Sequence, residues 1–287
     1  MRQIDFEHGG IAQNILKAAL PMLVAQVLNL LYNIVDRIYI GHMADVGAAA
    51  LTGVGLFTPI LMLITAFAML CGSGGAPRAS ISMGKGDYDS AEKILGGCVL
   101  MQVVISAVLT VVLLVFGRDL LLAFGASENT IDYAADYMSI YAIGTLFVQL
   151  TLGLNAFITA QGFAKYGMLT VLIGAAANIV LDPIFIFGFK MGVRGAALAT
   201  VISQGISCIW VILFLRGGKT VLKLKRENIR FAPRIILPCI ALGLATFIMQ
   251  ASESVISVCF NSSLLKYGGD IAVGAMTILT SVMQFAM

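Results

Sequence analysis

Charged side chains are scarce in this sequence, and that scarcity is the first feature that bounds its class. Only 11% of the 287 residues are Asp, Glu, Lys or Arg, against about a quarter in a water-soluble domain. Hydrophobic residues make up 59%, and the mean hydropathy is +0.96. A chain with so few ionic groups, gathered between long apolar runs, is solvated mainly by lipid. The composition therefore excludes an ordinary soluble domain and predicts an integral membrane protein.

The motifs of common enzyme classes are also absent from the sequence. It contains no GxxxxGK[ST] phosphate loop, and neither HExxH nor GxSxG occurs. Its five cysteines lie in or beside apolar runs without CxxC spacing, so we expect small buried hydrophobic side chains. The Lys and Arg residues form no basic face with interleaved aromatics, which argues against a nucleic-acid partner. We predict no catalytic residues, no cofactor and no nucleic acid.

Long apolar runs dominate what is present, and they predict an all-α membrane protein. Eight runs are long enough to cross about 30 Å of hydrocarbon. They cover residues 15–40, 51–71, 94–116, 133–159, 168–189, 196–215, 235–260 and 271 to the last residue. The first run carries no small-residue cleavage pattern, so we interpret it as a spanning helix and not as a signal peptide.

The basic residues predict the orientation of these helices. If successive runs cross in alternate directions, most Lys and Arg residues fall on one side, including a cluster from Arg216 to Arg234. Basic loops stay in the cytoplasm, so this side and the N-terminus are predicted to be cytoplasmic. We interpret the basic cluster as a topology signal and a connector between two units.

The chain also repeats itself at a fixed offset. Five pairs of chemically similar residues share one offset. Residues 45–52 also resemble residues 270–277 more weakly, at a slightly larger offset. Six helices separate the copies, so both enter the membrane in the same direction, as in transporters built from parallel repeats. The matched pairs, each 217 positions apart, are Lys17 and Arg234, Leu20 and Leu237, Pro21 and Pro238, Asn33 and Gln250, and Asp36 and Glu253.

This repeat predicts the domain organisation. We expect a six-helix N-terminal lobe at 1–215, a basic cytoplasmic linker at 216–232 and the start of a second six-helix lobe at 233–287. Doubling the offset gives a full chain of about 430 residues or more, with twelve helices. The sequence is therefore expected to be a truncated transporter that contains two helices of its second lobe.

Apart from Asp136, which lies near the start of its run, three acidic residues fall inside the predicted spanning helices, where an ionised carboxylate is costly and is a functional candidate. They are Asp36, Asp182 and Glu253. Asp36 and Asp182 each lie roughly 8 to 10 Å short of the predicted outer end of their helices, at 1.5 Å per residue. We therefore expect them at the same height in the membrane. An ion pair of Asp36 with its neighbour Arg37 is the main structural alternative.

Two further polar residues fall near that height. Thr200 is predicted at the same level on the sixth helix, and Asn178 lies one turn from Asp182 on the same helical face. Together with the two carboxylates, their oxygens would form a site for a proton or for Na+, a hard cation. Hydroxyls and amides also bridge helices without any such role, and that alternative stays open.

Four segments resemble motifs of the multidrug and toxic compound extrusion (MATE) family. They are VDRIYIGHM at 35–43, LNAFITAQG at 154–162, NIVLDPIFIFG at 178–188 and GVRGAALATVISQ at 192–204. The resemblance extends over the whole chain and is strongest to the branch found in Gram-positive bacteria. It implies a twelve-helix fold in two lobes and a multi-pass protein of the bacterial cytoplasmic (inner) membrane.

The resemblance also implies a function and a set of site residues. Members of the family export cationic or amphipathic compounds in exchange for H+ or Na+, without a cofactor. Asp36, Asn178, Asp182 and Thr200 match the cation site of the N-terminal lobe, and Asn155 matches a polar position in that lobe. Glu253 matches an acid on helix seven, and Gln250 is the repeat partner of Asn33. We expect Asn155, Gln250 and Glu253 to contact the substrate or a cation of the second lobe. We expect a secondary antiporter, monomeric when full length, whose partners are small cationic drugs and the lipid bilayer.

Two other classes of protein remain as alternatives. A flippase for lipid-linked precursors shares this general architecture, but would favour cationic residues in its central cavity to bind a diphosphate. A membrane-embedded enzyme with a pair of carboxylates would need two catalytic acids on facing helices. The acidic character of the buried charges favours the antiporter, and we predict that the chain is not an enzyme.

Overall fold

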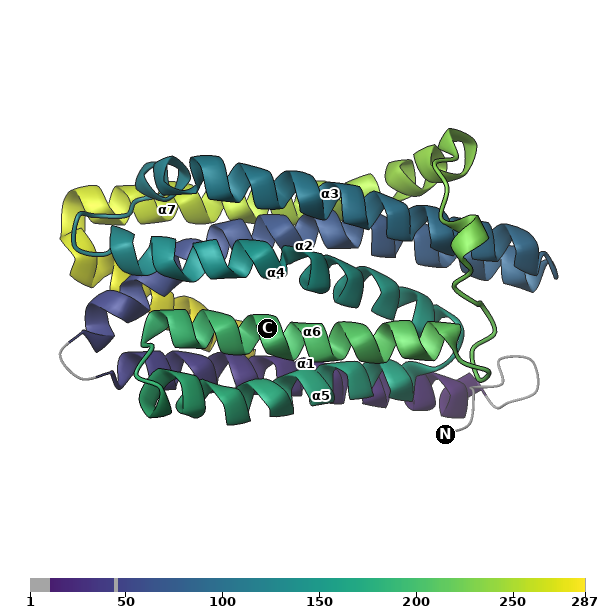
Figure 1. The fold of residues 1–287 in the computed structure, drawn as a ribbon, viewed down its shortest axis with the longest axis horizontal. Helices are drawn as coiled ribbons and strands as arrows, with labels where there is room; N and C mark the ends of the chain where they lie inside the picture. The colour runs from purple at the N-terminus through teal and green to yellow at the C-terminus, as the bar shows by residue number, and fades with distance from the viewer. Residues whose placement is uncertain (1–10, 44–45, 287) are drawn as a thin grey trace.

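The protein is an elongated bundle of long helices. The computed structural model describes residues 11–43 and 46–286, and every regular element within them is a helix (Figure 1). The long helices are α1 (Ile11–Gly41), α2 (Gly47–Gly84), α3 (Tyr88–Ala123), α4 (Ile131–Ala160), α5 (Ala164–Pro183), α6 (Val193–Arg216) and α7 (Pro233–Ala286). Two short elements are the π-helical turn η1 (Ile184–Gly188) and the 3-10 turn η2 (Arg226–Asn228). The all-α prediction is confirmed.

The helices have the length and composition of membrane spans. Among the described residues, seven helices are long and apolar enough to cross a bilayer. Their outer faces are apolar: on α3, Val104, Val108, Val111 and Val115 recur every three or four residues and are all exposed. Such a stripe would be unfavourable in water, because it removes no apolar surface from solvent. It is a surface for contact with lipid, as expected of a multi-pass membrane protein.

α7 consists of two helical pieces, which correspond to the seventh and eighth predicted runs. The pieces meet at Gly269, whose φ of 64° and ψ of −166° are non-helical and favour glycine. Both pieces pack against the first half of α2: Ser254 donates a hydrogen bond to the carbonyl of Pro59 (2.8 Å), and Gly274 lies against Thr52. The repeat-related segment 270–277 thus contacts α2, whereas residue 45 of its counterpart lies outside the described residues.

Glycines allow α2 and α7 to approach each other closely. A Cβ atom at Gly74 would lie 1.9 Å from the carbonyl oxygen of Cys239, and one at Gly243 would lie 2.1 Å from that of Leu70. Small residues at a helix interface allow this approach in membranes, where packing replaces the hydrophobic effect between helices. The α2–α7 contact therefore depends on the absence of side chains at two positions.

The connections gather at two ends of the bundle. The α2–α3 connection, the α4–α5 connection and residues 217–232 lie at one end, which we call the linker end (Figure 1). There, Gln161 Oε1 accepts hydrogen bonds from the hydroxyl of Thr220 (2.8 Å) and from the amides of Val221 and Leu222 (2.9 Å each). The linker begins as an ordered strap fixed to the end of α4.

A second anchor for the linker lies on α3. The buried carboxylate of Glu92 accepts a hydrogen bond from the amide of Lys223 (3.2 Å) and pairs with the ammonium of Lys225 at 2.6 Å. This contact raises the pKa of Lys225, because the carboxylate stabilises its charged form. The linker is thus tied to both α3 and α4, while the division of the chain into lobes at 215 and 233 stays a prediction.

The close α2–α7 contact makes a testable prediction about stability. Gly243→Ala places a methyl group against the carbonyl of Leu70, so the helices must separate. We expect a loss of about 1–3 kcal/mol, the usual cost of overpacking, measured as a lower melting temperature of the detergent-purified protein. The matched control is Gly84→Ala, where a Cβ meets nothing within 4 Å. Equal melting temperatures for the two variants would contradict this account of the interface.

Candidate functional site

Asp36 and Asp182 come from different helices and meet inside the bundle. Asp36 lies on the last turns of α1, and Asp182 lies next to the end of α5. Their side chains are only 9% and 0% exposed, and the two carboxyl groups are within hydrogen-bonding reach of each other. Two ionised carboxylates this close in a site of low dielectric repel strongly. The pair therefore requires a shared proton or a bound cation.

Asn178 on α5 connects the carboxyl pair to α6, the third helix of the site. Its side-chain amide donates to Asp182 Oδ1 at 3.2 Å and to the hydroxyl of Thr200 at 3.3 Å. Thr200, on α6, in turn donates to the carbonyl of Ala196 at 3.0 Å. The structure thus brings together the four residues that the sequence singles out as a cation site, from α1, α5 and α6.

Several oxygen atoms of the site have no hydrogen-bond donor among the described residues. They are Asp36 Oδ1, Asp182 Oδ2 and Asn178 Oδ1, and all three are buried. A buried acceptor without a donor costs about 1–3 kcal/mol. The unsatisfied groups are all acceptors, so what is missing is a positive or hydrogen-donating species. The oxygen set suits a proton or a hard cation such as Na+.

Two tyrosines, Tyr137 and Tyr32, also belong to the site, and neither was predicted from the sequence. Tyr137 on α4 is buried close to Thr200 and Asp36 and stacks on Tyr141, with ring centroids 6.0 Å apart. Tyr32 lies one turn before Asp36 on α1 and lines a small polar cavity together with Asn178 and Thr200. The spacing of four residues between Tyr32 and Asp36 could have indicated a shared face. Nothing in the sequence pattern singles out Tyr137.

The backbone changes its winding directly after Asp182. α5 ends at Pro183, which has no amide hydrogen to donate, and the chain continues as the π-helical turn η1. π-Helical turns inside helices are frequently found at functional sites. Gly195 on α6 allows η1 to pack closely, because a Cβ there would lie 2.7 Å from the carbonyl carbon of Phe185. This packing fixes the end of α5 and with it the position of Asp182.

Asn155 lies outside the carboxyl pair but lines a cavity that extends to Asn178 and Thr200. It donates to the carbonyl of Gly167 at 3.3 Å, and its own carbonyl oxygen is buried without a donor among the described residues. Asn155 shares a polar cavity of about 60 Å³ with Asn178 and Thr200. The structure therefore places Asn155 on the linker side of the predicted cation site.

Glu253 and Gln250 lie on α7, in a different part of the molecule. Glu253 is exposed and lines a cavity of about 400 Å³ together with Arg37 and Thr277. Gln250 is half-buried and lies one turn earlier on the same helix. The repeat relation of Asp36 to Glu253 therefore does not bring these two acids into one site.

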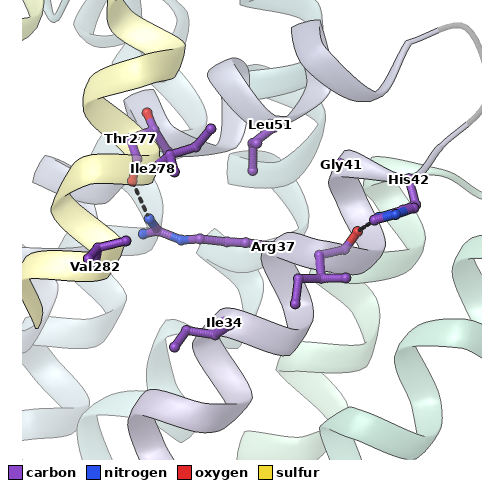
Figure 2. Close-up of a pocket in the computed structure, with 9 residues that line it drawn as sticks. Ile34, Arg37, Gly41, His42, Leu51, Thr277, Ile278 and Val282 are labelled. Atoms are coloured by element: carbon purple, nitrogen blue, oxygen red, sulfur yellow. Dashed lines mark hydrogen bonds between the residues drawn. The ribbon is translucent and has the colours of Figure 1, made fainter. Parts of the chain in front are cut away.

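Arg37 points away from the carboxyl pair, towards α7. Figure 2 shows its guanidinium donating to the carbonyl of Thr277, at 2.9 Å. It lines a second, largely apolar cavity of about 550 Å³, whose walls include Ile34, Leu51 and Val282 (Figure 2). The consecutive residues Asp36 and Arg37 thus face two different compartments on different sides of α1.

These features define a class: a multi-span helical membrane protein with a buried acidic site beside large cavities. Comparison with known families agrees, because the MatE family model matches residues 21–184. The chain belongs to the MatE family, whose members are transporters and not enzymes. Both the resemblance and the prediction that the chain is not an enzyme are confirmed.

Two curated relatives show how much of a transporter the chain represents. It is 28% identical over 280 residues to the multidrug export protein MepA of Staphylococcus haemolyticus (strain JCSC1435). It is 24% identical to MepA of Staphylococcus aureus (strain NCTC 8325 / PS 47), again over 280 residues. Each alignment covers 98% of this chain and 61% of the relative. The chain therefore spans about three-fifths of the length of these bacterial exporters.

Solved structures support the same fold. The MATE multidrug transporter DinF-BH superimposes with a TM-score of 0.93 at 30% identity, over all of this chain and 64% of that one. An inward-facing MATE family transporter of the MOP superfamily gives a TM-score of 0.82 at 26% identity, over 92% of this chain and 59% of that one. The helical arrangement described above is therefore that of a MATE transporter.

The geometry around Asn178 predicts its contribution to stability. Asn178→Leu leaves Asp182 and Thr200 without the amide that bridges them, so we expect a loss of about 1–3 kcal/mol. The measurement is the melting temperature of the detergent-purified protein. Asn129→Leu is the control, because Asn129 is exposed and its contact with Asp270 is long, at 3.4 Å. A larger shift for the control would contradict a structural role for the bridge.

Proposed function

We propose that this chain is the cation-coupling part of a secondary multidrug antiporter, which exports cationic or amphipathic compounds in exchange for H+ or Na+. The observation that carries the proposal is the buried contact between Asp36 and Asp182. The names of the relatives, which are multidrug exporters, agree with it. The remaining ligands of the coupling ion are Asn178 and Thr200.

The pair would couple ion binding to conformation through electrostatic repulsion. Asp36 is carried by α1 and Asp182 by α5, so repulsion between the carboxyl groups separates these helices unless a cation lies between them. A ligand drives a conformational change only through a difference in its affinity for the two states. Here that difference would be the energy of bringing two carboxylates together, which the coupling ion cancels.

The substrate would bind on the other side of α1. The two larger cavities lie between α1, α2 and α7 and are lined mainly by apolar side chains, with Glu253 and Arg37 as charged groups. An apolar wall with one carboxylate suits an amphipathic cation. Among the described residues that line these cavities, Arg37 favours a flippase for an anionic lipid precursor, but its guanidinium is already engaged by Thr277.

The whole transporter would contain a second lobe that begins at 233. The sequence repeat, the linker strap and the length of the relatives support this division. The linker end would be cytoplasmic, because it holds Lys85 directly after α2, Lys165 in the first turn of α5 and the cluster from Arg216 to Arg234. We propose a monomer in the bacterial inner membrane, with a cytoplasmic N-terminus.

Neutralising either carboxylate tests the proposed coupling site. In the full-length transporter, Asp36→Asn and Asp182→Asn should each reduce ethidium efflux to the background of cells without the transporter, because the repulsion that ion binding relieves is gone. The amount of protein in the membrane should be unchanged. Asp132→Asn is the control, since Asp132 is 76% exposed and pairs with exposed Arg118. Efflux at the wild-type rate in both site variants would rule out the assignment.

Imposed gradients identify the coupling ion and separate the proposal from its alternative. In proteoliposomes with the full-length protein, either a pH gradient or a Na+ gradient should drive ethidium transport, and Asp36→Asn should remove that response. The oxygen ligands of the site are compatible with both ions. Transport of a lipid-linked diphosphate without dependence on either gradient would instead support the flippase.

A further inference from the structure

One face of α5 carries only small and polar residues, from the carboxyl pair towards the linker end. Gly167, Thr170, Gly174, Asn178 and Asp182 follow one another at intervals of three or four residues, which places them on one side of the helix. Thr170 lies about 18 Å from Asp182 along the helix axis, at 1.5 Å per residue. Polar groups inside membrane helices are costly, and where they face the bundle interior they mark pathways for ions and protons.

Polar residues of α4 and α6 meet this face. Ser207 on α6 donates to the carbonyl of Thr170 at 3.0 Å, and Thr151 on α4 donates to the carbonyl of Gln204 at 3.4 Å. These groups enclose the cavity of about 60 Å³ described above. The defining residues of this polar track are Thr151, Asn155, Thr170, Asn178, Ser203 and Ser207.

Several hydrogen-bonding groups of the track act as acceptors towards the cavity. The hydroxyls of Thr170, Ser203 and Ser207 all donate to backbone carbonyls, so their oxygens face the cavity as acceptors only. The side-chain carbonyl oxygens of Asn155 and Asn178 are buried and have no donor among the described residues. Asn178 as a whole is only 2% exposed, so bulk water does not reach it. These acceptors call for an occupant that brings hydrogen-bond donors, and the side chains of Asn29, Tyr32 and Gln204 in the same lining can donate to it.

The size of the cavity limits what that occupant can be. A volume of about 60 Å³ is room for about two water molecules, at roughly 30 Å³ each. Glycines keep the track open, because a Cβ at Gly174 would lie 2.6 Å from the hydroxyl of Ser207 and one at Gly167 would lie 2.8 Å from that of Thr159. Water and hydronium meet both requirements, whereas a drug molecule does not fit.

We propose that this polar track is a water-filled proton route that connects the Asp36–Asp182 pair to the linker end within the bundle. It rests on the proposed function, and it separates the two transported species: protons move between α4, α5 and α6, and the drug moves on the α7 side of α1. A proton leaving the pair passes to a water molecule of the track and is released at the linker end. The pair keeps the negative charge until another proton arrives.

Blocking the track should slow proton release without changing the coupling site. In proteoliposomes with the full-length protein, drug-induced proton release is followed with a pH-sensitive dye. Asn155→Leu and Thr170→Val should slow it by about tenfold or more, as expected when a proton-transfer group is lost, while ethidium binding and the number of protons released per drug stay unchanged. Thr145→Val is the matched control, because Thr145 is also a buried threonine that donates to the carbonyl four residues before it.

A second measurement detects the water directly and does not depend on transport. In a variant of the full-length protein without its native cysteines, Ser207→Cys should react with a small, charged thiol reagent added from the linker side. The reaction should be about tenfold or more faster than for Thr145→Cys, because the thiolate that reacts forms only where water reaches it. The variants retain a small side chain at each position, so folding is preserved.

The outcomes distinguish this inference from the proposed function. Wild-type rates of proton release in both track variants, together with equal thiol reactivity at positions 207 and 145, would overturn the route. Transport driven by Na+ without any proton release would also overturn it, while leaving the antiporter intact. Loss of all gradient-driven transport in the wild-type protein would instead remove the proposed function.

Discussion

The structure depends on a contact that is unfavourable by itself: two carboxyl groups in hydrogen-bonding reach, shielded from water and facing apolar helices. In water, two such groups interact weakly, but in a site of low dielectric the same distance gives a strong repulsion. The helices around Asp36 and Asp182 are held by packing over their whole length. This packing keeps the two acids together at a cost in electrostatic free energy, and binding of a positive species offsets that cost.

The surrounding packing is suited to hold such a site. Asn178 bridges two of its members, and η1 and Gly195 fix the end of α5. On the other side of the molecule, Gly74 and Gly243 bring α2 and α7 into backbone contact. Membrane helices gain little from hydrophobic burial against one another, so such close approaches and internal hydrogen bonds carry much of their association. The stable framework and the strained acidic pair are thus built from different residue types.

Much of this arrangement could be predicted from the sequence. Composition and run length indicated the class and nearly all the helices, because lipid permits few alternatives for a long apolar segment. The equal heights assigned to Asp36, Asp182 and Thr200 follow from helix rise alone, and these residues do lie together. Their role as a coupling site stays a prediction. The position of Tyr137 was missed because contacts between distant helices leave no mark in the local pattern. The turn at Gly269 lay between two predicted runs, but its conformation could not be read from spacing.

The linker illustrates the same limit. Its positive charge could be recognised from the sequence, but its attachment to Gln161 and Glu92 could not, since both partners are far away in the chain. A polar residue at the end of a helix has many possible partners. Only the three-dimensional arrangement shows that Gln161 receives three donors from one short segment.

α1 has a geometric property that follows from two adjacent residues. Asp36 and Arg37 project from neighbouring positions, about 100° apart around the helix axis, one towards α5 and the other towards the carbonyl of Thr277 on α7. If α1 turns about its own axis, the acid and the base swing in the same rotational sense, so one group leaves its partner as the other is displaced. A small rotation of α1 about its axis would therefore change the contacts of Asp36 with α5 and those of Arg37 with α7 at the same time.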